Sequence, residues 1–170
     1  MNVWLGKFQP IPLDLEECIV NTKSFGNIGE AMALSSFVKK GIPVYLPFGD
    51  NEKADLIAEF NGKLNRIQVK TSLYARDGKM VFDLTSSYSH RGRPAHKYSQ
   101  EEVDYFFCYN IERNQSYLFP VPENPIASIC IRYEEPKNNQ IRHIKHEENY
   151  LFDHVIDAMI NSADECELAA

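Results

Sequence analysis

The stretch ADLIAEFNGKLNRIQVKTS, residues 54–72, decides the fold. It holds two β-like runs separated by the pair Asn61-Gly62, which is the strongest short signal for a hairpin with a two-residue type I′ turn. A two-residue loop pairs Phe60 with Lys63, and this first pair fixes the register of all the pairs behind it. The stretch therefore predicts an antiparallel hairpin of known register.

In this register the two faces of the hairpin differ in character. Asp55 lies opposite Gln68, and Lys70 lies on the same face, diagonal to Asp55. Opposed side chains have Cβ atoms about 4.5–5.5 Å apart and diagonal ones about 7–8 Å, so these three polar groups are expected to form a cluster. The other face is apolar and is expected to pack in the core: Leu56, Ala58, Phe60, Ile67 and Val69.

The segment before the hairpin predicts a helix over about 27–40. Apolar residues recur there at helical spacing, and Gly41 provides the stop. Glu30 falls on the same stripe as Leu34 and Phe37, the centre of the apolar arc. A carboxylate directed at a core needs a partner.

Asp55, Gln68 and Lys70 offer Glu30 such a partner if a divalent cation lies between the acids. Two carboxylates with an amide or backbone oxygen are hard ligands suited to Mg²⁺, and an ammonium beside them can orient or deprotonate a water or meet a phosphate. That set of groups performs metal-assisted hydrolysis of a phosphodiester. The alternative is that Glu30 only completes a capping box begun at Asn27, while the hairpin acid and lysine are solvated surface groups.

The rest of the chain predicts an α/β domain with a central mixed sheet flanked by helices. Strands are expected at 42–48, 54–60, 63–72, 79–87, 103–110, 116–121 and 128–133, and an amphipathic helix at 149–160. The expected organisation is an N-terminal extension packed on the core (1–22), a single domain (23–162) and an acidic, frayed tail (163–170).

Composition narrows the class of protein. The chain has 170 residues without an apolar run long enough to span a membrane, no leader is expected at its N-terminus, and its four cysteines lack the spacing of a metal site. The net charge of −6 is unevenly distributed. Residues 63–97 hold eight basic and two acidic groups, whereas residues 147–170 hold seven acidic and no basic ones. Local charge decides attraction to a phosphate backbone, so the basic segment keeps a nucleic-acid partner open.

At these residues the sequence resembles the PD-(D/E)XK nuclease superfamily. The matching elements are GNIGEAMALSSFVKKG with Glu30, KADLIAEF with Asp55, and RIQVK with Gln68 and Lys70. The helix glutamate and the run GIPVYLPFGD look most like the branch of archaeal Holliday-junction resolvases and intron-encoded homing endonucleases. The likeness covers about residues 24–122. The chain departs from the pattern where Gln68 replaces the usual Asp or Glu, and where Ala54 precedes the first acid.

The resemblance implies a restriction-endonuclease-like core that hydrolyses phosphodiester bonds and leaves 5′-phosphates. It implies that Glu30, Asp55 and the carbonyl of Val69 bind Mg²⁺, with Mn²⁺ as a possible substitute, that Gln68 contributes, and that Lys70 assists the attacking water. Because glutamine brings no charge, weaker metal affinity or a single ion is expected.

The resemblance also implies a double-stranded DNA partner. Next to a metal cluster, the basic loop SHRGRPAHK is expected to contact phosphates, although it can equally be a solvated excursion. The residues expected on DNA are Lys63, Arg76, Lys79, Arg91, Arg93 and Lys97. Arg66 lies diagonal to Glu59 in the hairpin, so a surface ion pair is expected there instead.

The most specific expectation is an intron-encoded, site-specific homing endonuclease. One active site cuts one strand, so a homodimer or homotetramer is expected. The protein is expected to be cytoplasmic, to have no membrane contact, and to associate with the nucleoid when it is bound to DNA. The open alternatives are a Holliday-junction resolvase or restriction-type nuclease, and a catalytically silent DNA-binding or assembly module, which Gln68 makes credible.

Overall fold

The computed structural model describes residues 22–49, 52–86, 95–135 and 144–167. Within them lie a five-stranded sheet of order β1-β2-β3-β6-β7 and a three-stranded sheet of order β4-β5-β8. The first sheet consists of β1 Val44–Tyr45, β2 Leu56–Phe60, β3 Lys63–Ser72, β6 Tyr105–Asn110 and β7 Gln115–Pro120. The second consists of β4 Ala75–Arg76, β5 Lys79–Asp83 and β8 Ser128–Arg132. The helices are α1 Thr22–Lys39, the 3-10 helix η1 Glu147–Asn149 and α2 Phe152–Glu167.

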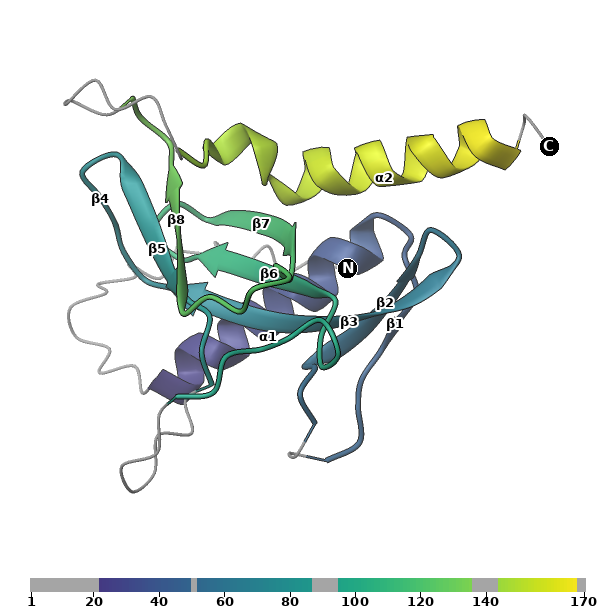
Figure 1. Ribbon diagram of the computed structural model, residues 1–170, viewed down its shortest axis with the longest axis horizontal. Helices are drawn as coiled ribbons and strands as arrows, with labels where there is room; N and C mark the ends of the chain where they lie inside the picture. The colour runs from purple at the N-terminus through teal and green to yellow at the C-terminus, as the bar shows by residue number, and fades with distance from the viewer. Residues whose placement is uncertain (1–21, 50–51, 87–94, 136–143, 168–170) are drawn as a thin grey trace, which may run out of the picture.

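The larger sheet is mixed, and both helices pack in the apolar cluster on one of its faces, where the rings of Phe37 of α1 and Phe152 of α2 lie 4.9 Å apart. Strand β3 is parallel to β6, and the other neighbours in that sheet are antiparallel. Figure 1 shows α1 crossing one face of the sheet, while α2 runs along the side on which β7 lies. The predicted α/β class with a mixed sheet is therefore confirmed. None of the described helices is long and apolar enough to cross a membrane.

The larger sheet separates two apolar clusters. Phe107 and Tyr109 of β6 face the cluster shared with α1 and α2, whereas Phe106 and Cys108 face the cluster shared with β5 and β8. This explains why β6 reads as a continuous apolar run, since a strand buried on both faces does not alternate. Strand β3, next to β6, thus lies in the middle of the molecule.

The β2–β3 hairpin has the predicted register. Phe60 pairs with Lys63, and Asn61 and Gly62 have φ of +54° and +65°. Positive φ at both central residues is the signature of a type I′ turn. The apolar face is buried as predicted, with all of its members in one cluster: Leu56, Ala58, Phe60, Ile67 and Val69.

Helix α1 begins earlier than the sequence pattern predicts. It starts at Thr22 rather than near Asn27, so Glu30 lies in the third turn and not in the first. The capping-box interpretation of Glu30 is therefore wrong, because that motif needs the acid at the helix start.

The packed face of α1 also differs from the predicted stripe. The buried residues are Gly29, Ala33 and Phe37, whereas Glu30 is exposed and Leu34 is 37% exposed. A Cβ atom at Gly29 would overlap Oγ1 of Thr71, so glycine lets α1 approach β3 closely. Small residues, rather than large apolar ones, define the contact with the sheet.

Strand β1 is much shorter than predicted. Only Val44–Tyr45 pair with β2, instead of the whole segment 42–48. Pro43 and Pro47 flank the paired dipeptide, and proline has no N–H to donate to a ladder.

Strand β5 and the C-terminal helix also depart from their predicted bounds. Strand β5 ends at Asp83 rather than at residue 87, because the Asp83 carboxylate accepts hydrogen bonds from N and Oγ1 of Thr85 (2.8 and 2.7 Å) and turns the chain. Helix α2 starts later than residue 149 and continues to Glu167, so residues 163–167, predicted to fray, are helical. The short strand β4 was not predicted, and the remaining strands agree within two residues.

Candidate active site

Asp55 immediately precedes β2, whose ladder with β3 ends at Leu56–Ile67. Its backbone N–H donates to the carbonyl of Ile67 (2.9 Å). Its carboxylate Oδ2 accepts hydrogen bonds from the backbone N–H of Val69 (2.7 Å) and from Nε2 of Gln68. The structure thus brings the Asp55 side chain to Gln68 and Val69 of β3 as the turn predicted, although the backbone ladder ends at Leu56–Ile67 and does not include Asp55.

The Val69 carbonyl lies on the β2 side of β3, beyond the last residue pair between β2 and β3. Residues two apart in a strand direct their backbone groups to the same neighbour, so this carbonyl faces the same way as that of Ile67, past the end of β2. Its hydrogen bond comes from Nε2 of Gln68 at 3.3 Å. The amide nitrogen of Gln68 therefore lies between two oxygens, one from Asp55 and one from Val69.

Burial of Asp55 sets its electrostatics. Desolvation is the largest cause that raises the pKa of Asp55 to about 6, and the nearby charge of Glu30 adds to it. The hydrogen bond from Val69, the charge of Lys70 and the hydrogen bond from Gln68 lower the pKa but do not offset the burial. A half-buried carboxylate of this kind is stabilised by a cation.

Glu30 extends from α1 over the same region. It lines a cavity of about 560 Å³ together with Gln68, Val69 and Lys70, and a second cavity of about 380 Å³ together with Asp55. The helical acid therefore lines both cavities and the hairpin acid only the second, and Glu30 is exposed rather than buried among apolar residues as predicted.

The ammonium of Lys70 contacts two groups other than the acids. Its Nζ donates to the backbone carbonyl of Thr85 (2.7 Å) and lies 4.9 Å from the ring centroid of Tyr98. Desolvation lowers the pKa of Lys70, and the charges of Asp55 and Asp83 act in the opposite direction. Burial raises the pKa of Tyr98 to about 12, so its phenol is neutral at pH 7.

No local sequence pattern marks Thr85, Tyr98 or Thr71 as part of this site. Thr85 falls in the predicted strand 79–87 and Tyr98 in the basic loop that follows it, and their contacts with Lys70 are long-range. Thr71 lines the larger cavity, and its buried Oγ1 has no hydrogen-bond partner among the described residues. An unpartnered buried hydroxyl is uncommon and marks the polar character of this space.

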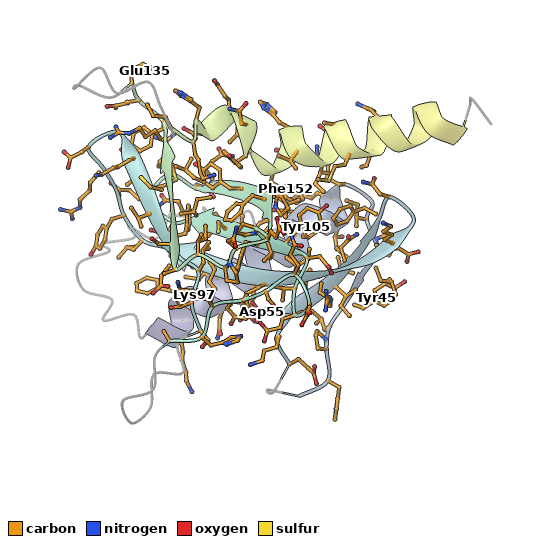
Figure 2. All side chains as sticks on the ribbon, in the orientation of Figure 1. Tyr45, Asp55, Lys97, Tyr105, Glu135 and Phe152 are labelled. Atoms are coloured by element: carbon orange, nitrogen blue, oxygen red, sulfur yellow. The ribbon has the colours of Figure 1, made fainter. Side chains whose placement is uncertain are left out.

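The basic residues expected on DNA lie at different distances from the site. Lys97 is exposed and pairs with Thr85 in an isolated bridge, and in Figure 2 it lies with Asp55 on the lower side of the sheet. Lys63, at the hairpin tip, is seven residues from Lys70 along β3. That spacing is about 23 Å in a strand, so Lys63 does not join the cluster.

Two further basic residues lie on the smaller sheet. Arg76 of β4 is exposed and its guanidinium lies 4.7 Å from the ring centroid of Tyr74, while Lys79 of β5 is half-buried. Arg91 and Arg93 lie outside the described residues.

The expected ion pair between Arg66 and Glu59 is wrong. Arg66 forms a two-point pair with Asp104 instead, with Nη2 to Oδ1 and Nε to Oδ2 both at 2.9 Å. Glu59 accepts a hydrogen bond from the hydroxyl of Tyr45 (2.8 Å). Through its ion pair with Asp104, Arg66 therefore links β3 to the segment before β6.

The donor set suits one hard divalent cation. No group of three or more His, Cys, Asp or Glu side chains in the described part of the chain is placed to hold a metal ion. The site instead combines the carboxylates of Asp55 and Glu30 with two neutral oxygens, the Val69 carbonyl and the amide of Gln68. Carboxylate and carbonyl oxygens are the ligands of Mg²⁺, which commonly keeps several waters. The set fits if Gln68 turns its amide oxygen toward the ion.

Comparisons with known proteins agree with this geometry. A model of the PD-(D/E)XK endonuclease family matches residues 20–153. Among solved structures, the bacterial homing endonuclease I-Ssp6803I is similar, with 21% sequence identity, a TM-score of 0.60 and coverage of 88% of this chain and 99% of that one. At this identity the likeness concerns the fold. Comparison with curated proteins found no match. The family match spans most of the chain, including the helix, the hairpin and β6, and the chain therefore belongs to the PD-(D/E)XK endonuclease family.

Proposed function

We propose that this nuclease is a Mg²⁺-dependent, site-specific endonuclease of double-stranded DNA, of the homing type. The observation that carries the proposal is the contact of the Asp55 carboxylate with Gln68 and Val69 of β3, with Lys70 on the same strand. The homing type is supported by the fold shared with a bacterial homing endonuclease.

Four residues would hold the cation: Asp55, Glu30, Val69 through its carbonyl, and Gln68. A divalent ion bound there would act as a Lewis acid toward the scissile phosphate and lower the pKa of the attacking water. Mn²⁺, which accepts the same oxygen ligands, is expected to substitute. Glu30 lies at the open side of the site and so is the acid nearest to incoming solvent and substrate.

Lys70 would orient the attacking water and exchange a proton with it. Its lowered pKa brings the ammonium closer to the range in which a lysine gives and takes protons near neutral pH. The carbonyl of Thr85 fixes the position of Nζ, so the group is oriented before substrate arrives.

DNA would reach the site across the exposed basic side chains near it. Lys97 is the best placed of those described, since it forms an isolated bridge with Thr85, whose carbonyl contacts Lys70. Arg76 and Lys79 lie on the neighbouring sheet, and Lys63 would contact phosphate farther along the duplex. Arg91 and Arg93 remain proposed DNA contacts from the sequence alone. Cleavage of both strands would require a homodimer or homotetramer.

Plasmid cleavage tests the proposal. The protein is incubated with supercoiled plasmid carrying candidate target sites in Mg²⁺ or Mn²⁺, beside Lys70→Ala and the control Lys39→Ala, an exposed lysine at the end of α1. We expect nicking that needs the metal, is lost in Lys70→Ala and is kept in Lys39→Ala.

A catalytically silent DNA-binding module is the second candidate. The amide nitrogen of Gln68, between the oxygens of Asp55 and Val69, favours it because that nitrogen fills the place of a cation. Binding to DNA without nicking, over linear and branched substrates in both metals, would establish the module and refute the nuclease.

A further inference from the structure

We infer that Tyr98 is a positioning residue for Lys70, acting with the carbonyl of Thr85 to hold the ammonium at the reaction centre. The inference rests on the proposed role of Lys70 in cleavage. It adds a residue that lies 28 positions along the chain from the lysine and belongs to no sequence motif of the site.

The ammonium of Lys70 contacts two different kinds of neutral acceptor. Nζ donates to the Thr85 carbonyl at 2.7 Å and lies 4.9 Å from the Tyr98 ring centroid, within the range of a cation–π interaction. None of the ion pairs among the described residues includes Lys70. The lysine is therefore held in place without an ion pair to Asp55, whose carboxylate stays available for a cation.

The Tyr98 ring is itself held rigidly. It is 7% exposed and packs edge-on against Phe106 of β6, with centroids 5.9 Å apart and an interplanar angle of 81°. The ring of His96 packs on it at 5.6 Å. A ring fixed in this way can fix the group above its face.

The Thr85 carbonyl is fixed by the pairing of two chain segments. Thr85 forms an antiparallel bridge with Lys97, and the N–H of Ser86 donates to the carbonyl of His96 (2.9 Å). The Asp83 carboxylate holds the N–H and the hydroxyl of Thr85 from the other side. The carbonyl and the ring thus belong to one paired unit, which we call the lysine clamp: residues 85–86 and 96–98.

A graded replacement of the ring tests the clamp. Tyr98 is replaced by Phe, then by 4-fluorophenylalanine and 3,4,5-trifluorophenylalanine, which keep the shape of the ring and progressively remove the negative charge of its face. Single-turnover cleavage is measured at saturating DNA, together with thermal unfolding. Tyr98→Phe is expected to cleave within about twofold of the parent, and the trifluoro variant about fivefold more slowly than Tyr98→Phe, with unchanged unfolding.

A second measurement is independent of cleavage. The Nζ-bearing methylene protons of Lys70 lie near the ring, so their NMR signals are expected at shifted positions in the parent and in Tyr98→Phe, and at ordinary positions in Tyr98→Leu. Equal cleavage rates across the fluorinated series, or unshifted Lys70 signals in the parent, would overturn the clamp. If the parent cleaves no DNA, the proposed function fails, and the NMR signals alone decide whether the ring holds the lysine.

Discussion

Replacing Asp55 with Asn is expected to stabilise the metal-free protein at neutral pH while it abolishes cleavage. Asn has nearly the same shape and keeps an oxygen that can accept the hydrogen bond from Val69, but it carries no charge. Burial raises the pKa of the Asp55 carboxyl in the folded protein from its ordinary value of 3.8 to about 6. The native state therefore binds this proton more tightly than the unfolded chain does.

The sign and size of the effect follow from that difference. Below pH 3.8 the carboxyl is protonated in both states, so its burial is not penalised. Between about pH 3.8 and 6 the unfolded chain releases this proton while the native state retains it, so stability falls as the pH rises and levels off above about 6. A difference of about two pKa units corresponds to about 3 kcal/mol, all of it present at pH 7.5. For a chain of this size Asp55→Asn is thus expected to unfold about 6–12 °C higher than the parent at pH 7.5.

Urea unfolding in EDTA between pH 4 and 8 measures this effect. The parent is expected to lose stability as the pH rises toward 7, and Asp55→Asn is expected to lose about 3 kcal/mol less over the same interval. Glu59→Gln, a change at an exposed acid on β2, is the matched control and should follow the parent. Saturating Mg²⁺ at about 100 times Kd should then stabilise the parent by about 2.7 kcal/mol and leave Asp55→Asn unchanged. If Asp55→Asn has the pH dependence of the parent, the burial argument is wrong.

Three other changes test separate parts of the structure. Gln68→Glu places a third carboxylate at the site and is expected to bind Mg²⁺ at least about tenfold more tightly in calorimetric titration, since carboxylates bind hard cations better than amides do; an unchanged affinity would remove this residue from the ligand set. Gly29→Ala is expected to destabilise the protein by about 1–3 kcal/mol in urea unfolding because its Cβ overlaps Thr71, whereas Gly26→Ala, with open space around it, should be neutral or stabilising by up to about 1 kcal/mol. Lys97→Ala is expected to reduce the slope of log affinity for DNA against log salt concentration by about 1, and a parental slope would show that this side chain does not touch phosphate.

The sequence predicted the part of the fold that short-range chemistry controls. The Asn61-Gly62 turn needs positive φ at both positions, and the alternation behind it leaves only one register that buries the apolar face. The position of Asp55 beside Gln68 follows from the same pairing. The roles of these residues in catalysis remain predictions, since geometry alone does not test them.

The face of α1 was mispredicted for a physical reason. The pattern of large apolar residues placed Glu30 beside Leu34 on the packed stripe, but the helix meets the sheet through Gly29 and Ala33. Close packing of a helix on a strand selects small residues, which an apolar pattern does not count. Glu30 nevertheless reaches the site, because a residue next to a packed stripe borders the groove between helix and sheet.

The contacts that no local pattern predicts are those between distant segments. Lys70 meets Thr85 and Tyr98, and Arg66 meets Asp104, only because β3 and β6 pair in parallel with a long connection between them. The residues next to these side chains in the sequence do not predict either contact. Such contacts depend on the tertiary fold.

Gln68 allows the buried site to be stable when no metal ion is bound. A glutamate there would add a second charge beside a carboxylate whose pKa is already raised by burial, and like charges in a shared site disfavour ionisation further. The glutamine instead donates a hydrogen bond to Asp55 and another to the Val69 carbonyl, so it satisfies the two oxygens in the absence of a cation. The same amide supplies no charge to an incoming ion, and its nitrogen must rotate away before its oxygen can bind. At residue 68, therefore, the amide that stabilises the metal-free protein also weakens metal binding. The phosphate of bound DNA is the group that can supply the negative charge that a carboxylate at this position would have brought.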